Sequence, residues 1–367
     1  MYRCVVAALA AVALAGSALT GCDAATAPTS SPAAGGSGSV SVIAKGLRIP
    51  WGMAFLPDGT ALVTERDSGR VLSVTPGGQV QEVYRLPRWP TPDGSIGVRA
   101  GAEVGLLGIA VPPTYTTDRW VYLYYTSFAS RPKVSSDNRI VRFRIGQTDL
   151  EPILTGIPAG DFHGGGRIAF GPDGMLYITT GETFYTRSIA QDTDSLGGKI
   201  LRVTPEGKPA PGNPFPDSPV WSIGHRNVQG IAWDRRGRLY ATEFGQDDYD
   251  ELNLIEPGRN YGWPLVEGAG SDPRFTNPIT TWTPTGIASP SGMAVIDDWI
   301  YVACLAGQVL YRVSLDGRTT EPLFKGTYGR LRTATAAPDG SLWLTTSNHD
   351  GRGRPGPDDD KILRLIP

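Results

Sequence analysis

Cysteine and histidine are scarce in this chain, with three of each in 367 residues. Cys4 and Cys22 lie in an N-terminal segment that resembles a leader, so the rest of the chain has Cys304 alone and no internal disulfide. Cys304 stands in the apolar run IYVACLAG, where we expect it to fill the core. The sequence also has no His/Cys spacing typical of zinc, no Gly-rich phosphate loop between a strand and a helix, and no GxSxG motif.

An excess of charge of one sign is also missing. The 34 Lys and Arg nearly balance the 36 Asp and Glu, which gives a formal net charge of -2 and a pI near 6.0. This balance provides no electrostatic footprint for nucleic acid. After residue 22, no run approaches the ~18 apolar residues that a membrane span needs. With 47 Gly and 31 Pro, the composition indicates a loop-rich globular protein.

Residues 1–21 are expected to be a bacterial lipoprotein signal peptide. A positive charge is followed by an apolar stretch and by LTGC, which matches the lipobox and ends at Cys22. We expect Cys22 to carry lipid, so that the protein lies outside the cytoplasm and is anchored to the cell membrane. Residues 22–39, rich in Ala, Ser, Gly and Pro, are expected to be a disordered tether. Ordinary cleavage beside an incidental Cys is the alternative.

One pattern recurs along the rest of the chain: small and apolar residues, a turn often spelled PDG, and an alternating apolar strand. The six copies are residues 51–66, 105–126, 166–182, 230–245, 291–307 and 331–347. Successive copies are 56, 59, 63, 62 and 41 residues apart, and no amphipathic helix lies between them. We therefore predict an all-β fold over residues 40–367, a six-bladed β-propeller with four-stranded blades. A β-sandwich is the alternative, but it rarely needs six copies of one hairpin.

In a propeller, loops at one end of the blades converge over a central channel, so the site is expected in the inter-repeat loops. His163 in DFHGGGRIAF is a candidate general base because His titrates near neutral pH. Arg226 is a planar, permanently charged hydrogen-bond donor that suits a carboxylate, and Asn227 adds a donor and an acceptor. Arg330 and Arg332, at i and i+2 before the last repeat, are expected to share one strand face. Three arginines aimed at one channel would suit a multiply anionic ligand, although solvated surface arginines remain the alternative.

Acidic groups supply a second set of candidates. Glu103 in AEVGLLG precedes the second repeat and could present a carboxylate in the same ring of loops. The loop GQDDYDE (245–251) offers carboxylates and free carbonyls, which are ligands that calcium prefers. Its spacing is not that of an EF-hand, so an ordinary acidic turn stays possible. His225, next to Arg226, is expected to orient its neighbours and not to react.

Together these motifs resemble the soluble quinoprotein sugar dehydrogenases, the glucose/sorbosone dehydrogenase family that includes the bacterial aldose sugar dehydrogenases. The similarity runs from about Val42 to Leu365. The motifs that carry it, in the family's order, are WGMAFLPDG (51–59), EVGLLG (103–108), HGGGRIAFGPDG (163–174), GHRNVQG (224–230) and DELNLIEPGRNYGWP (250–264).

The resemblance implies a propeller that holds pyrroloquinoline quinone (PQQ) and calcium over the channel and oxidises the anomeric hydroxyl of aldoses to lactones. His163 would be the general base that removes the hydroxyl proton during hydride transfer to PQQ, and Arg226 would act near the reactive carbonyls. Calcium would polarise the quinone, and an external electron acceptor would reoxidise it.

The remaining roles also follow from the resemblance. The implied PQQ contacts are Glu103, Arg226, Asn227, Arg330 and Arg332. The implied ligands of the cofactor's calcium are the carbonyls of Gly245 and Gln246, and those of a separate structural calcium are Glu251 and the Tyr261 carbonyl.

This chain departs from the family at two positions. Ala306 stands where glucose-oxidising relatives have a Lys, and Glu103 stands where relatives often have a Gln. Both changes put PQQ affinity in question. The chain lacks the long insertions of dimeric glucose enzymes, so we expect a monomer. Two alternatives stay open: a redox-inactive propeller that binds a glycan or protein partner, and a metal-dependent sugar lactonase. Substrate specificity is expected to depend on loops 88–102, 183–195 and 265–290.

Overall fold

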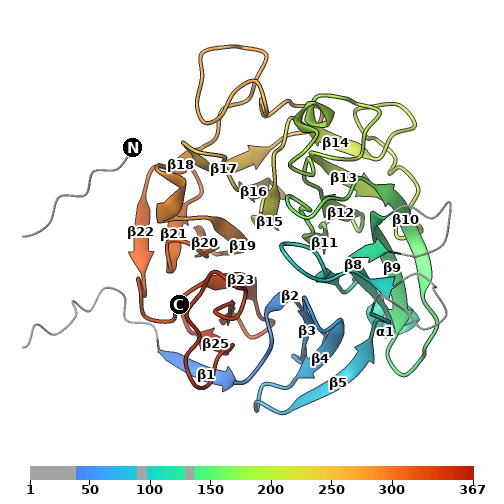
Figure 1. Ribbon diagram of the computed structural model, residues 1–367, viewed down its shortest axis with the longest axis vertical. Coiled ribbons are helices and arrows are strands. Elements are labelled where there is room, and N and C mark those ends of the chain that lie inside the picture. Colours follow the sequence, from blue (N-terminus) through green and yellow to red (C-terminus); the bar gives the residue numbers. More distant parts are fainter. Residues whose placement is uncertain (1–38, 89–96, 129–135) are drawn as a thin grey trace, which may run out of the picture. The chain divides into compact units, whose positions relative to one another are not determined.

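The PDG turns and alternating strands form six antiparallel sheets arranged around one axis (Figure 1). The computed structural model describes residues 39–88, 97–128 and 136–367. Those residues belong to one unit that spans residues 36–367. The predicted signal peptide and nearly all of the tether fall outside the described residues. The six-bladed β-propeller with four-stranded blades is confirmed.

Each repeat found in the sequence is the inner hairpin of one blade. The first sheet contains β2 (Pro50–Phe55), β3 (Ala61–Glu65), β4 (Arg70–Val74) and β5 (Val80–Arg85). The second contains β7 (Leu106–Ala110), β8 (Trp120–Phe128), β9 (Asp137–Arg144) and β10 (Glu151–Ile157), with the short β6 (Gly97–Val98) beside β8. The third contains β11 (Ile168–Phe170), β12 (Leu176–Thr179), β13 (Lys199–Val203) and β14 (Val220–Ile223).

The last three sheets follow the same order. The fourth contains β15 (Val228–Trp233), β16 (Leu239–Glu243), β17 (Asp250–Ile255) and β18 (Thr280–Trp282). The fifth contains β19 (Pro290–Ile296), β20 (Trp299–Cys304), β21 (Val309–Ser314) and β22 (Thr320–Leu323). The sixth contains β23 (Leu331–Ala336), β24 (Leu342–Thr346), β25 (Ile362–Leu365) and β1 (Val40–Ala44). The described helical segments are short: α1 (Tyr115–Asp118) and the 3-10 turns η1 (Arg187–Ala190) and η2 (Thr285–Ile287). None of these has the length or apolarity to cross a membrane.

The ring closes through the N-terminal strand. β1 pairs antiparallel with β25, from Val40 opposite Leu365 to Ala44 opposite Ile362, so both ends of the propeller share one blade. The last sheet is therefore completed by the strand that leads directly into β2 of the first blade, and this pairing closes the ring.

Glycine lets neighbouring blades approach closely around the axis. A Cβ on Gly52 would lie 2.7 Å from the Leu107 carbonyl oxygen, and one on Gly108 would lie 2.2 Å from the Gly166 oxygen. A Cβ on Gly230 would meet the Ser291 oxygen at 2.4 Å. These glycines hold one equivalent position in the innermost strands. A side chain there would clash with the backbone of the next blade.

Arg167 holds the same position in the third blade and fills the axis with its side chain. It is buried, and its guanidinium donates to the Gln229 carbonyl oxygen (3.0 Å) and to the Thr333 hydroxyl (3.1 Å). It also lies 4.3 Å from the centre of the Trp51 ring. Thr333 is the equivalent residue of the sixth blade, so these two blades are joined across the channel.

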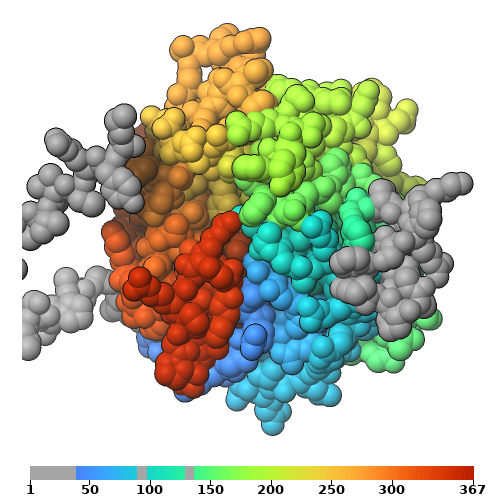
Figure 2. All heavy atoms as spheres, in the orientation of Figure 1, coloured from blue at the N-terminus to red at the C-terminus, as the bar shows by residue number. Residues whose placement is uncertain are grey.

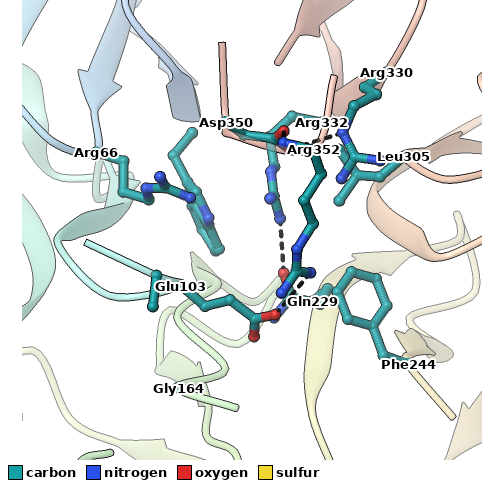
Figure 3. A pocket seen from close by; sticks show the side chains of 12 residues that line it. Arg66, Glu103, Gly164, Gln229, Phe244, Leu305, Arg330, Arg332, Asp350 and Arg352 are labelled. Carbon is teal, nitrogen blue, oxygen red and sulfur yellow. Dashed lines mark hydrogen bonds and ion pairs between the residues drawn. The ribbon is translucent and has the colours of Figure 1, made fainter. Parts of the chain in front are cut away.

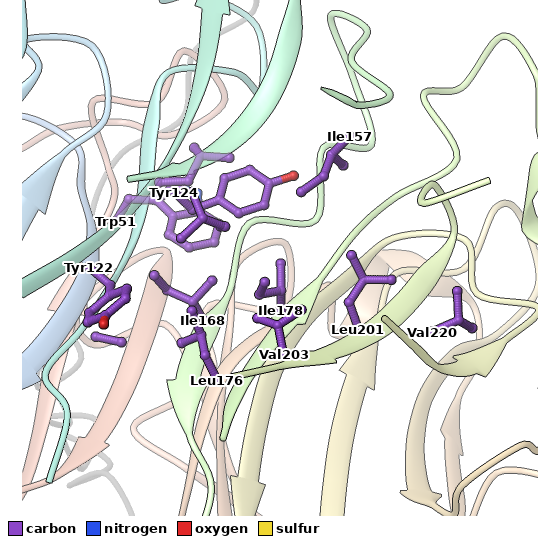
Figure 4. Close-up of a cluster of buried hydrophobic side chains, with 13 residues drawn as sticks. Trp51, Tyr122, Tyr124, Ile157, Ile168, Leu176, Ile178, Leu201, Val203 and Val220 are labelled. Carbon is purple, nitrogen blue, oxygen red and sulfur yellow. The ribbon is translucent and has the colours of Figure 1, made fainter. Parts of the chain in front are cut away.

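A hydrophobic cluster between the second and third blades supports the turn that carries His163 (Figure 4). Leu107, Ile168 and Ile178 pack there around Tyr124, whose burial raises the pKa of its phenol. The Tyr124 hydroxyl donates to the Gly164 carbonyl oxygen at 2.7 Å. Burial of each large side chain stabilises the fold by about 1.5–3 kcal/mol, and here it also fixes the backbone beside the candidate base.

The close approach of the blades predicts a steric test at Gly108. We expect Gly108→Ala to lower the free energy of unfolding by about 3 kcal/mol or more, because its new Cβ would meet a backbone oxygen. Denaturant unfolding measures the change. Gly77→Ala is the matched control: its Cβ would have only the Thr75 hydroxyl oxygen nearby, at 3.8 Å, so we expect a change within about 0.5 kcal/mol. Equal changes in the two variants would contradict this account.

Candidate functional site

Loops from several blades meet over one end of the channel and enclose two joined hollows. In the space-filling view, teal, green and red segments from distant parts of the chain come together near the centre (Figure 2). The outer hollow is roomy and open to solvent, whereas the inner one is narrow and more enclosed. Both are lined by Glu103, Phe244, Leu305, Arg330 and Arg352.

The structure brings most of the predicted site residues together. The outer hollow is lined by Glu103, His163, Arg226, Gly245, Gln246 and Arg330. Arg332 lines the inner hollow beside Gln229 (Figure 3), and Trp51 also lines it. Asn227 lines neither hollow, and Glu251 and Tyr261 also lie apart from them. The expected convergence of inter-repeat loops is therefore found.

His163 is held by its neighbours in one orientation. Its backbone is in the left-handed region (φ 52°), and its N–H donates to a carboxylate oxygen of Glu103 at 3.2 Å. Its ring Nδ1 lies 2.9 Å from an oxygen of the buried Glu182. A carboxylate at Nδ1 favours the tautomer with the proton there, which leaves Nε2 as a free acceptor. This is the geometry of an oriented general base.

The inner hollow ends at a buried cation, Arg332. This residue donates to the side-chain oxygen of Gln229 (3.0 Å) and to the Ser291 hydroxyl (3.3 Å), and it lies 5.6 Å from the Trp51 ring centre. Burial lowers the pKa of Arg332 to about 9, so the group stays charged at neutral pH. Its Nε has no hydrogen-bond partner among the described residues. The positive charge of this guanidinium favours an anion in the hollow that it lines.

Arg226 is a second buried cation, at the wall of the outer hollow. Its Nη1 donates to the Phe244 carbonyl oxygen at 3.0 Å, and its guanidinium lies 5.4 Å from the Trp263 ring centre. Burial lowers its pKa, and Glu182 and Glu243 act in the opposite direction. Its Nε is buried without a partner in the described part of the chain. Arg226 and Arg332 thus each have a buried Nε–H that lacks a hydrogen-bond acceptor among the described residues.

Buried side chains behind Arg226 fix its backbone and that of its neighbour. His225 is fully buried between Glu243 (Nδ1 to Oε2, 2.9 Å) and Ser222 (Nε2 to Oγ, 2.8 Å), and the other Glu243 oxygen accepts the Arg226 N–H. His225 has no access to the hollows, so it can orient Arg226 only through Glu243. Asn227 accepts the N–H of Gly165 at 3.1 Å, while no described residue accepts from its buried Nδ2.

Two ion pairs stand at the junction of the hollows. Arg330 donates from Nε to Asp350 at 2.8 Å, and both side chains are largely buried. Arg352 pairs with Glu103 at 3.0 Å, and 58 % of the Arg352 side chain is exposed. Figure 3 shows Arg352 reaching across the pocket to Glu103. The carboxylate at position 103 therefore faces a guanidinium from the last blade.

The acidic loop after β16 is arranged around one carboxylate. A single oxygen of Glu267 accepts the backbone N–H groups of Gln246, Asp247, Asp248 and Tyr249, at 2.7–3.2 Å. Asp250 lies beneath the loop, and burial raises its pKa to about 7. The Gln246 side-chain oxygen is buried and receives no donor from the residues described. These oxygens could accept a hard cation; the family resemblance implied a different pair of ligands in this loop, the backbone carbonyls of Gly245 and Gln246.

Glu251 and Tyr261 lie deeper, behind the same loop. Burial, followed by the nearby Glu243 charge, raises the pKa of Glu251 to about 8. The Asn253 amide donates to Glu251 at 3.0 Å, while its buried oxygen meets no donor in the described ranges. The Tyr261 ring stacks on His225 with the ring centres 4.8 Å apart. Within residues 39–88, 97–128 and 136–367, no three acidic, His or Cys side chains are grouped as a metal site, so a cation here would need backbone and amide oxygens.

Sequence reasoning did not identify several residues of the site. Glu182, Arg352, Phe184 and Gln229 line or support the hollows without having been singled out. A signal existed for Glu182, because Glu65 and Glu243 end the second strand of their repeats and Glu182 lies three residues after the end of β12. Cys304 is fully buried in β20, as predicted, and burial raises the pKa of its thiol well above the usual range.

Comparison with known proteins identifies the family to which this chain belongs. The PQQ-bound form of aldose sugar dehydrogenase from Streptomyces coelicolor is similar at 47 % identity and a TM-score of 0.80, over 89 % of this chain and 98 % of that one. A putative oxidoreductase (glucose dehydrogenase) from Thermus thermophilus is similar at 42 % identity and a TM-score of 0.79, over 90 % and 100 %. Aldose sugar dehydrogenase YliI of Escherichia coli is 28 % identical over 85 % of this chain and 91 % of its own. The sequence model of Glucose / Sorbosone dehydrogenase matches residues 47–363, so the chain belongs to this family of oxidoreductases.

Proposed function

We propose that this protein is a PQQ- and calcium-dependent aldose dehydrogenase, which oxidises the anomeric hydroxyl of a sugar to the lactone and passes the electrons to an external acceptor. One observation carries the proposal. Buried arginines with unmet donors, within the described residues, line the same pair of hollows as a histidine whose ring is oriented by a carboxylate. The similarity to the PQQ-bound enzyme of Streptomyces coelicolor supports it.

The donors of this chain fit a multiply anionic cofactor. Arg226 Nε and Arg332 Nε are buried donors without partners in the described structure, and PQQ carries three carboxylates. Asn227 Nδ2 is also unpartnered there, but Asn227 lines neither hollow and would contact the cofactor only from behind the wall. Arg332 would hold the cofactor at the inner end, with Arg330 at the junction and Arg226 at the outer wall. When bound, PQQ supplies the two-electron acceptor that no side chain provides.

His163 performs the proton transfer in this proposal. Glu182 holds the Nδ1 proton, so Nε2 accepts the proton of the anomeric hydroxyl as the lactone forms. The Glu182 carboxylate then stabilises the resulting imidazolium. Glu103 fixes the backbone of His163, and Arg352 balances the Glu103 charge, so this Glu is compatible with an anionic cofactor beside it.

Calcium would occupy two positions in this proposal. The carbonyls of Gly245 and Gln246 would hold a cation next to the cofactor, where it would act as a Lewis acid. Glu251 and the Tyr261 carbonyl would hold a second, structural cation. The side-chain oxygens of Gln246 and Asn253, which no described donor reaches, fit this assignment because hard cations bind oxygen. The two alternatives, a redox-inactive glycan-binding propeller and a lactonase, leave the buried arginines and their unmet donors without a role.

Replacement of Arg332 tests cofactor binding. We expect Arg332→Gln to weaken PQQ binding by about 10- to 150-fold, the loss typical of one charged hydrogen bond. Absorbance titration of the purified protein with PQQ measures the affinity. Arg318→Ala is the control, since the Arg318 side chain is 87 % exposed, and it should bind PQQ like the wild type. Failure of the wild-type protein to form a saturable PQQ complex would refute the proposed function.

Replacement of His163 separates chemistry from binding. We expect His163→Gln to reduce kcat for aldose oxidation by about 10²- to 10⁴-fold, because it removes the general base, while the PQQ affinity stays within about threefold. Glu182→Gln should give a smaller fall in kcat and a shifted pH–rate profile, because it alters the partner of Nδ1. Dye reduction with an artificial electron acceptor measures both variants. A His163→Gln enzyme that keeps wild-type kcat would rule out this assignment.

Removal of calcium tests the cation sites. We expect a chelator to lower the Tm of the wild-type protein and calcium to restore it, because a bound cation stabilises the folded state by mass action. Glu251→Gln should reduce this calcium-dependent shift in Tm by more than half. Calorimetric unfolding with and without calcium measures the shift, and Glu206→Gln is the control because Glu206 is exposed in the turn after β13. Identical shifts in Glu251→Gln and wild type would exclude Glu251 as a ligand.

A further inference from the structure

Three aromatic rings lie between His163 and the surface at the outer hollow. Phe162 and Phe184 line the hollow with His163, and the Phe184 ring centre lies 5.2 Å from the His163 ring and 5.8 Å from the Phe162 ring. Tyr185 continues outward, with its ring 5.3 Å from that of Phe184. Phe184 is 41 % exposed and Tyr185 68 % exposed. These neighbouring rings form one aromatic patch at the mouth of the hollow, where a ligand could contact them.

The backbone that presents these rings is held in an unfavourable conformation. Thr183 and Phe184 both lie in the left-handed region, with φ of 68° and 71°. The Phe184 N–H donates to Glu182, the same carboxylate that orients His163, and the Thr183 N–H reaches the His163 carbonyl oxygen at 3.4 Å. Strain of this kind persists only where the surroundings enforce it, and it is common at ligand sites. Glu182 therefore couples the ring positions to the base.

A buried ammonium anchors the segment that follows. Lys199 donates from Nζ to the carbonyl oxygens of Ile189 (2.6 Å), Ala190 (3.1 Å) and Gly197 (2.7 Å). Burial lowers its pKa to about 8. The loop between β12 and β13 is thus tied to the blade at both ends, so the aromatic pair is presented by a fixed loop.

Pyranose sugars match this combination of surfaces. A pyranose ring has an apolar face of C–H bonds, which packs on an aromatic face, and a rim of hydroxyls, which needs donors and acceptors. Phe184 offers the aromatic surface, and Glu103, Arg226 and His163 offer polar groups in the same hollow. The Tyr185 ring stands nearly perpendicular to the Phe184 ring, at an angle of 89°, on the outward side of it, so a second sugar unit that leaves the hollow would pass Tyr185.

We propose that Phe184 and Tyr185 form a sugar-stacking lip that determines substrate preference. Phe184 contacts the pyranose ring that reacts at His163, and Tyr185 contacts the next unit of a reducing disaccharide. This inference rests on the proposed function for the identity of the reacting group, but the predicted sugar contacts can be measured without turnover.

The test compares Phe184→Ala and Tyr185→Ala on glucose, on maltose and on 1,5-anhydroglucitol, a glucose analogue without the anomeric hydroxyl. We expect Phe184→Ala to raise KM for both sugars and the calorimetric Kd for the analogue by about three- to tenfold, with kcat within about threefold of wild type. Tyr185→Ala should raise KM for maltose by about three- to tenfold and leave glucose unchanged. Phe184→Tyr should restore wild-type values.

Controls separate the lip from a structural role. Val80→Ala removes another exposed apolar side chain, 45 % exposed on β5, and should change none of these constants. Wild-type KM and Kd in both alanine variants would overturn the proposal, as would a fall in kcat at constant KM. If the wild-type enzyme binds no PQQ or oxidises no sugar, the proposed function alone is rejected. The calorimetric titration with 1,5-anhydroglucitol then still tests whether the lip binds sugar. No detectable binding of the analogue to wild type would also reject the lip.

Discussion

Close contact between neighbouring innermost strands is the constraint on which the rest of this structure depends. Gly52, Gly108 and Gly230 allow one blade to touch the backbone of the next. Because the ring is closed by β1 on β25, each such contact fixes blades on both sides. Arg167 takes the equivalent position in the third blade and fills the axis as far as Thr333. The floor of the site is therefore a product of the same repeat that builds the blades.

The site residues stand one position before this packing layer. Trp51, Gln229 and Arg332 directly precede Gly52, Gly230 and Thr333, and they line the inner hollow. These three side chains line the end of the channel, whereas Leu107, at the same position before Gly108, packs in the hydrophobic cluster. Adjacent residues of one strand thus serve different purposes, one lining the hollow and the next packing between blades, because successive side chains of a strand face opposite ways.

Burial creates opposite demands on the two sides of the site. Arg226 and Arg332 are cations with donors that no described residue satisfies, whereas Asp250 and Glu251 have pKa values raised to about 7 and 8. Buried charges without partners cost free energy. An anionic ligand near the arginines and a cation near the acids would relieve both costs.

The sequence by itself determined the blades, because PDG turns and period-two alternation are local signals that each hairpin carries. It also indicated His163, Arg226 and Arg332 through their places before a repeat. It could not reveal that Glu182 orients His163, that Arg352 crosses to Glu103, or that Phe184 stands beside the base. Arg332 and Arg318 are the same residue type, yet one is buried at the axis and the other is on the surface. Only ring closure decides this difference, because burial and pairing depend on blades that are distant along the chain.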